Sequence, residues 1–140
     1  MRQCVVTLLC CALLSAISLA VSAEEAAAYD TGQAAVDEAY SWIGTPYGAY
    51  GADCSGFTSI VYGNQGVYLP DDPAAQYSYG VPSEAAAGDL VFFDEAGYGI
   101  SHVGIATGYG TVIHASTYFG IVTETPISDI PGYVDAVDPS

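Results

Sequence analysis

Apolar residues recur at intervals of three and four along residues 31–42 and again along residues 57–61, and both patterns predict helices. Between them, residues 43–52 are rich in glycine and include a proline, which is typical of a loop. Cys54 directly follows this loop, so the second helix is predicted to begin close to Cys54. The first half of the domain is therefore predicted to be mainly helical.

The pattern changes in the second half of the chain. Residues 67–88 contain three prolines among scattered alanines and tyrosines, and they predict an irregular crossing with one turn of helix at residues 74–77. Short runs of apolar, β-branched and aromatic residues then predict strands at 89–93, 102–107, 111–117 and 121–127. Helices followed by antiparallel strands indicate a single domain of the α+β class.

The loop between two of these strands predicts where two histidines lie. A three-residue connection at 108–110 would pair Thr107 with Thr111, so that Gly104 faces His114. His102 then lies on the same face, diagonal to His114, at roughly 7 Å between backbones. A two-residue loop would place the histidines on opposite faces. Gly104 removes a side chain from this face, which we expect to let another element approach closely.

Composition and charge narrow the class of protein. The chain has 140 residues, 51% hydrophobic and 12% charged, which fits one compact domain and excludes disordered and collagen-like chains. One Lys or Arg stands against sixteen Asp and Glu, for a formal net charge of −15. This balance argues against a nucleic-acid partner, because binding phosphates requires clustered cations.

The first 23 residues have the pattern of a secretory signal peptide. Arg2 supplies the positive charge, residues 5–21 are nearly all apolar, and small side chains precede a predicted cleavage after Ala23. The mature chain would be one domain, residues 24–140, secreted or in the cell envelope, without stable membrane association. Losing Arg2 takes its net charge from −15 to −16. The alternative is a membrane anchor, since roughly 17 apolar residues is the lower limit for spanning.

Cleavage would leave Cys54 as the single cysteine, and so without an intrachain disulfide. Its thiol would be a buried small hydrophobe, a dimerising group or a nucleophile. A helix N-terminus and a neighbouring imidazolium favour the thiolate. A carboxylate about 10 Å away in water opposes it by only about 0.4 kcal/mol, against up to about 2 kcal/mol from the helix. Asp53 is adjacent, so its carboxylate must point away from the sulfur.

These residues together suggest catalysis by a cysteine nucleophile. Cys54 would attack a carbonyl, His102 would act as general base and then as acid for the leaving amine, and His114 would orient His102. The backbone amide of Cys54 is a candidate oxyanion donor. Each histidine could instead be structural. The set could also hold a metal, but it lacks a fourth close ligand and the spacing of zinc sites, so we expect no metal or cofactor.

A series of short motifs follows the same order as these candidate residues. They are WIGTPY at 42–47, DCSGF at 53–57, LP at 69–70 with Gln76, GDLVFF at 88–93, HVGI at 102–105 and IHAS at 113–116. In this order and spacing, the chain resembles the NlpC-type cell-wall endopeptidases, bacterial cysteine peptidases with a papain-like core. The resemblance covers nearly the whole mature chain, and its specificity lies in the motifs taken jointly.

The resemblance implies a papain-like core in which N-terminal helices, one led by Cys54, pack on an antiparallel sheet. It also implies hydrolysis of peptidoglycan stem peptides, typically between γ-D-glutamate and the diamino acid that follows. By position, Cys54 matches the nucleophile of the family, His102 the base and His114 the third polar residue.

Three further positions match substrate-binding or oxyanion residues of the family. Tyr47 matches a tyrosine whose hydroxyl lies near the nucleophile. Asp53 and Ser55 match residues that in some members recognise the free amino terminus of a stem peptide. Tyr47 could instead be a packed loop aromatic, and Ser55 could be a helix cap.

The chain also departs from the family pattern. Asp71 stands where many relatives have an arginine after Leu-Pro, and Ala87 replaces the usual proline before Gly88. Without cations in the mature chain, a substrate carboxylate must be bound by backbone amides, hydroxyls or histidine, and binding to anionic wall polymers is not favoured.

Two alternatives to a peptidoglycan endopeptidase stay open. One is a Cys-His amidase or acyltransferase acting on another amide, and the other is a non-catalytic wall-associated protein on the same scaffold.

Overall fold

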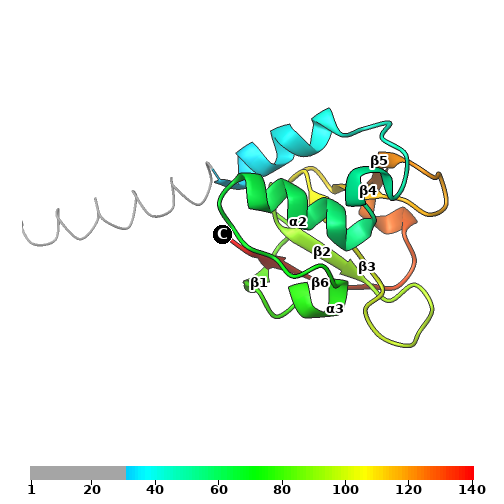
Figure 1. Cartoon of the computed structure of the whole chain (residues 1–140). Coiled ribbons are helices and arrows are strands. Elements are labelled where there is room, and N and C mark those ends of the chain that lie inside the picture. Colours follow the sequence, from blue (N-terminus) through cyan, green and yellow to red (C-terminus); the bar gives the residue numbers. More distant parts are fainter. Residues whose placement is uncertain (1–30) are drawn as a thin grey trace, which may run out of the picture. The chain divides into compact units, whose positions relative to one another are not determined.

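The computed structural model describes residues 31–140, so the predicted signal peptide and its anchor alternative lie outside the described residues. Residues 31–41 are helical, as the sequence predicts, and the longest labelled helix is α2 (Cys54–Asn64). Shorter elements are η1 (Ala49–Gly51), α3 (Pro73–Gln76) and η2 (Ile127–Asp129) (Figure 1). Within residues 31–140, every helix is too short or too polar to cross a membrane.

Six antiparallel strands form one sheet in the order β1-β6-β2-β3-β4-β5. Their bounds are β1 Val81–Ser83, β2 Leu90–Phe93, β3 His102–Ala106, β4 Thr111–Ala115, β5 Val122–Pro126 and β6 Tyr133–Asp138. The α+β class is confirmed. Four strands match predicted ones within one or two residues at each end, whereas β1 and β6 are not predicted by the sequence pattern.

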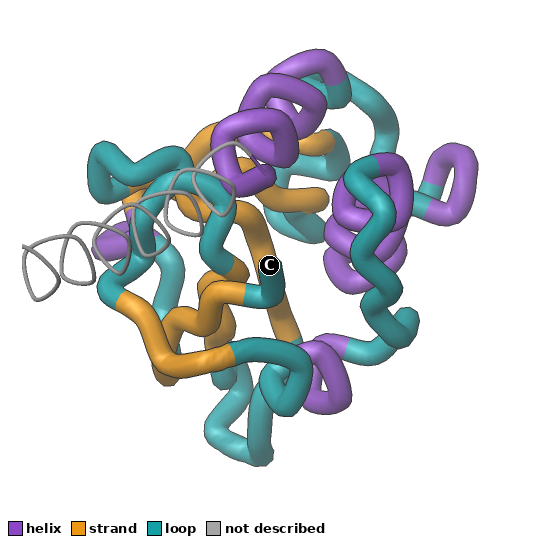
Figure 2. The backbone as a smooth tube through the Cα atoms, turned by 90° about the vertical axis from the view of Figure 1, so that its left-hand side faces the viewer, coloured by secondary structure: helices purple, strands orange, loops and turns teal. Residues whose placement is uncertain are grey.

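The alternation of side chains along the central strands divides the core in two. Leu90 and Phe92 of β2 pack with Phe57 of α2, whereas Val91 and Phe93 belong to a second apolar cluster. Side chains at alternate positions of a strand point to opposite faces, so the sheet has a helix-covered face and a second buried face. Figure 2 shows the two longer helices gathered on one side of the strands.

The register of the β3–β4 hairpin is the one predicted from its loop. Ile105 pairs with Ile113 and Ala106 with Val112, and the amide of Thr107 donates to the carbonyl of Thr111 at 3.0 Å. This register places both histidines on the sheet face opposite to the α2 core. The length of the loop therefore determines that both histidines lie on the same face of the sheet.

Gly104 has a different structural reason from the expected one. A Cβ at this position would lie 2.9 Å from the Cβ of His114 and would also clash with a methyl group of Val112. The missing side chain therefore makes room for β4 and its histidine. The expected approach of the Cys54-bearing element is not what Gly104 allows.

Candidate active site

Cys54 is the first residue of α2, so the predicted start of this helix is confirmed. Asp53 is the N-cap, and its Oδ1 accepts a hydrogen bond from the amide of Gly56 at 2.7 Å. Gly56 allows this tight turn, because a Cβ there would collide with the backbone oxygen of Gly51. The sequence between the loop and the helix thus fixes the backbone that carries the sulfur.

The thiol of Cys54 lies against the start of β3 and is only 9% exposed. Its Sγ donates to the carbonyl oxygen of Ser101 at 3.8 Å, and the backbone of Val103 also forms a hydrogen bond with it. The sulfur is thus held by the backbone on both sides of His102. The described hydrogen bond of the thiol goes to this backbone and not to the imidazole.

Burial raises the pKa of the Cys54 thiol above its ordinary value, and the nearby carboxylates of Asp53 and Glu95 raise it further. Hydrogen bonds with the backbone of Val103 and Ser55 act in the opposite direction. Burial thus opposes the thiolate that the helix N-terminus is expected to favour. Desolvation of a charged sulfur outweighs the stabilisation from the helix amides.

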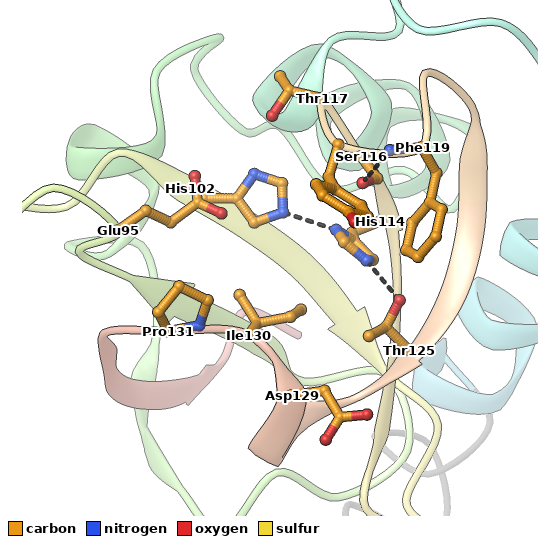
Figure 3. Close-up of a pocket in the computed structure, with 11 residues that line it drawn as sticks. Glu95, His102, His114, Ser116, Thr117, Phe119, Thr125, Asp129, Ile130 and Pro131 are labelled. Atoms are coloured by element: carbon orange, nitrogen blue, oxygen red, sulfur yellow. Dashed lines mark hydrogen bonds between the residues drawn. The ribbon is translucent and has the colours of Figure 1, made fainter.

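The histidines of β3 and β4 are in direct contact, as the hairpin register predicts. Nε2 of His102 lies 2.7 Å from Nδ1 of His114, and the two rings meet edge to face with centroids 4.9 Å apart. Nε2 of His114 in turn lies 2.9 Å from Oγ1 of Thr125 on β5. Figure 3 shows this chain of three side chains, each held by the next.

Both histidines are buried, with 3% and 4% exposure. Burial lowers the pKa of His102 to about 4, and the neighbouring His114 contributes to this shift. Burial alone lowers the pKa of His114 to about 4. Near pH 7 both rings are therefore neutral, and one nitrogen of each ring carries no hydrogen.

Tyr47 lies beside the sulfur, as the motif comparison implies. Burial raises the pKa of its hydroxyl, the nearby Cys54 and Asp53 raise it further, and a backbone hydrogen bond with Cys54 lowers it. Tyr47 remains 38% exposed, so it is not a packed core aromatic. Its hydroxyl and the backbone of Cys54 thus meet at the edge of the site.

Ser55 and Asp53 have different roles at the helix start. The hydroxyl of Ser55 donates to Oδ1 of Asp71 at 2.7 Å, so the helix-cap alternative for Ser55 is wrong and Asp53 is the cap. The buried amide of Gln76 holds the same turn, because its Nε2 donates to the carbonyl of Ser55 at 3.0 Å. Its Oε1 accepts the hydroxyl hydrogen of Thr58 at 2.7 Å.

A cavity of about 420 Å³ opens beside the histidine pair. It is lined by Glu95, His102, His114, Ser116, Thr117, Tyr118, Phe119, Thr125, Asp129, Ile130 and Pro131 (Figure 3). Sequence reasoning missed Thr125 and Glu95 as site residues. Thr125 had one usable signal, its place in a predicted strand beside His114, whereas Glu95 lies in a loop without a motif. Within residues 31–140, no group of three His, Cys, Asp or Glu side chains is arranged to hold a metal ion.

The helix-borne cysteine and the sheet-borne histidines together define an α+β domain of the papain-like type. The sequence profile of the NlpC/P60 family matches residues 37–133. The chain belongs to the NlpC/P60 family.

Individual relatives agree with this assignment. A protein of Corynebacterium glutamicum named probable endopeptidase is 43% identical over 124 residues, which cover 82% of this chain and 55% of the relative. A γ-D-glutamyl-L-lysine dipeptidyl-peptidase of Bacillus cereus is 33% identical over 111 residues, which cover 76% of this chain and 32% of the relative. The chain thus spans about half the length, or less, of these relatives.

A solved structure has the same fold. The NlpC/p60 domain of the peptidoglycan hydrolase SagA superposes with a TM-score of 0.67 at 39% identity. The match covers 76% of this chain and 97% of that domain. The described residues therefore correspond to nearly the whole of a separately crystallised domain.

Proposed function

We propose that this protein is a cysteine endopeptidase that hydrolyses peptidoglycan stem peptides, at the bond between γ-D-glutamate and the diamino acid that follows. The observation that carries the proposal is the placement of the Cys54 sulfur against the backbone on both sides of His102, with the ring of His102 held by His114. Relatives named as endopeptidases and peptidoglycan hydrolases support this substrate class.

The hydrogen-bond chain is compatible with the tautomers that this reaction needs. Nδ1 of His102 must be unprotonated to accept the thiol proton, so its Nε2 carries the hydrogen and donates to Nδ1 of His114. Nε2 of His114 then carries a hydrogen and donates to Thr125. His114 therefore orients the ring of His102 and holds its tautomer.

The reaction begins from a neutral Cys54 and a neutral His102. The proposed reaction requires the thiol to rotate away from Ser101 and toward Nδ1 of His102, and side-chain rotations are fast on the timescale of turnover. As the sulfur bonds to the carbonyl carbon, its proton passes to Nδ1 of His102. The imidazolium gives this proton to the leaving amine, and water then releases the acyl group from the sulfur.

The developing oxyanion needs donors on the other side of the carbonyl. The backbone amide of Cys54 lies at the N-terminus of α2, and the hydroxyl of Tyr47 lies beside it. We assign these two groups to the oxyanion. Asp53 and Ser55, close by, are assigned to recognition of the free amino terminus of the stem peptide, with Asp71 as an added carboxylate on Ser55.

Residues 1–23 are proposed to be a signal peptide, which would place the enzyme outside the cell or in its envelope. This location agrees with a peptidoglycan substrate. The large negative charge of the chain would not hold it on anionic wall polymers.

Digestion of purified sacculi tests the activity. The wild-type protein should release stem-peptide fragments whose masses place the cut after γ-D-glutamate, with water as the acceptor. Cys54→Ala should abolish release while its circular dichroism and thermal unfolding stay unchanged, because the sulfur supplies the bond-forming atom. Glu84→Gln, an exposed charge change away from the site, is the matched control. Undiminished cleavage by Cys54→Ala would end the proposal, and fragments cut at another amide would move it to an amidase.

A further inference from the structure

The cavity beside the histidines has the size and composition of a binding site for part of a substrate. Its volume of about 420 Å³ lies in the range of small-molecule pockets. Cys54 does not line it, whereas both histidines do. The cavity therefore lies on the histidine side of the reacting carbonyl and not on the sulfur side.

The chemistry decides which part of the substrate enters this cavity, provided that the proposed function holds. His102 protonates the leaving amine, so the residue that carries this amine must lie against the ring of His102. In a stem peptide cut after γ-D-glutamate, that residue is the diamino acid. Its side chain is then directed to the space lined by His102 and His114.

The charged groups around the cavity all have one sign. Glu95 and Asp129 are its carboxylates, and the lining has no Lys or Arg. The single basic residue of the sequence is Arg2, far from these residues in the chain and outside the described part. Both histidines are neutral near pH 7, so they do not offset the two carboxylates.

The remaining walls suit an alkyl chain that carries a charge at its end. Phe119, Ile130 and Pro131 supply apolar surface, and the ring of Tyr118 packs edge to face on that of Phe119 with centroids 4.9 Å apart. Figure 3 shows Glu95 beside His102 and Asp129 near Ile130, on separate parts of the lining. A methylene chain can cover the wall while its ammonium group meets a carboxylate.

We propose that Glu95 and Asp129 make this cavity a site for the amine-bearing side chain of the diamino acid and exclude a side chain that also carries a free carboxylate. The preferred substrates are stem peptides with L-lysine or with a diaminopimelate whose side-chain carboxylate is amidated. Stems with an unmodified diaminopimelate are disfavoured, because their extra carboxylate faces two like charges without a cation to pair with it.

Three synthetic tetrapeptide stems test this specificity: one with L-lysine, one with amidated meso-diaminopimelate and one with its free acid. The amidated and free forms differ only in the charged group, so their kcat/KM ratio isolates the electrostatic effect. We expect the wild type to favour the amidated stem by about tenfold at low salt, and the ratio to shrink as salt is added. The lysine stem should be cleaved at a rate close to that of the amidated stem.

Matched variants assign the effect to the two carboxylates. Glu95→Gln and Asp129→Asn should each bring the amidated-to-free ratio closer to one, and the double variant should nearly remove it. Glu84→Gln, at the opposite side of the sheet, should leave the ratio unchanged. Competing both stems in one reaction makes the ratio independent of the amount of folded enzyme, so a less stable variant is still informative.

The outcomes separate this inference from the function on which it rests. If the wild type cleaves none of the stems, the proposed function fails. If it cleaves amidated and free stems equally well, or if the double variant keeps the full preference, the inference is overturned while the function stands.

Discussion

The two halves of the candidate site are both buried, yet burial shifts their proton affinities in opposite directions. On the helix side, burial raises the pKa of the Cys54 thiol, and Asp53 and Glu95 add to the shift. On the sheet side, burial lowers the pKa of His102 and of His114 to about 4. A low dielectric disfavours the charged form of every group, which is the anion for a thiol and the cation for an imidazole.

These opposite shifts both favour the uncharged forms of the thiol and of the imidazoles. An ion pair of thiolate and imidazolium would require the thiol pKa to lie below the histidine pKa, and the shifts separate them the other way. In the proposed reaction, the proton would therefore move from sulfur to nitrogen only as the carbonyl accepts the electron pair of the sulfur. The helix N-terminus then stabilises the oxyanion more than it stabilises a resting thiolate.

The largest expected effect comes from removing the hydrogen bond between His102 and His114 on the sheet side of the site. His114→Gln should lower kcat/KM by about a hundredfold, because His102 loses the partner that fixes its ring and tautomer. In the wild type, kcat/KM should fall only as the pH drops through about 4, where His102 becomes protonated. The variant should lose activity at a somewhat higher pH, because burial still lowers the pKa of His102 but His114 no longer adds to the shift.

A purely structural role for His114 would lower activity without moving this acid limb. The pH profile of kcat/KM therefore distinguishes positioning from folding. Thr125→Val offers a milder test, since it removes only the outer hydrogen bond of the chain.

The second prediction concerns Gln76, which holds the first turn of α2 by hydrogen bonds. Gln76→Ala should lower the free energy of unfolding by about 2 kcal/mol, because it removes the buried amide that donates to the carbonyls of Ser55 and Pro70 and accepts from Thr58. Denaturant unfolding measures the loss. Gln33→Ala, which removes one exposed hydrogen bond to Asp37, should change stability by less than about 0.5 kcal/mol.

If the two sides are held independently, Gln76→Ala should leave the histidine pair intact. The titration of both imidazoles, followed by NMR, should then match that of the wild type. A change in the histidine pKa values in this variant would show that the helix start and the hairpin are coupled.

The smallest effect concerns the charge around the sulfur. Alkylation of Cys54 by iodoacetamide should rise only in the alkaline range, because the pKa of the thiol lies above its ordinary value of 9.0. Glu95→Gln should speed alkylation near pH 8 by about twofold, because it removes one carboxylate that raises the pKa of the thiol. Rapid labelling of the wild type at mildly acidic pH would contradict the neutral resting site.

The local part of the fold was predictable because it depends on short-range rules. Helical spacing and the N-cap position place Cys54 at a helix start, and a three-residue loop fixes the histidine register. By contrast, β1 and β6 escaped prediction. β6 is interrupted by Asp135 and ends on Asp138, so it lacks an apolar alternation, and it exists because β2 and β1 pair with it on either side.

The candidate site likewise has features that follow from the local sequence and features that depend on tertiary contacts. The sequence by itself determined which side chains are candidates for chemistry and which of them share a strand face, because side-chain direction follows from the backbone period and the turn length. Only the tertiary structure decided three features: the raised pKa of the Cys54 thiol, the hydrogen bond from Ser55 to Asp71, and the position of Glu95 and Asp129 in the lining of one cavity. Those outcomes depend on burial and on contacts between residues distant in the chain, which no local pattern encodes.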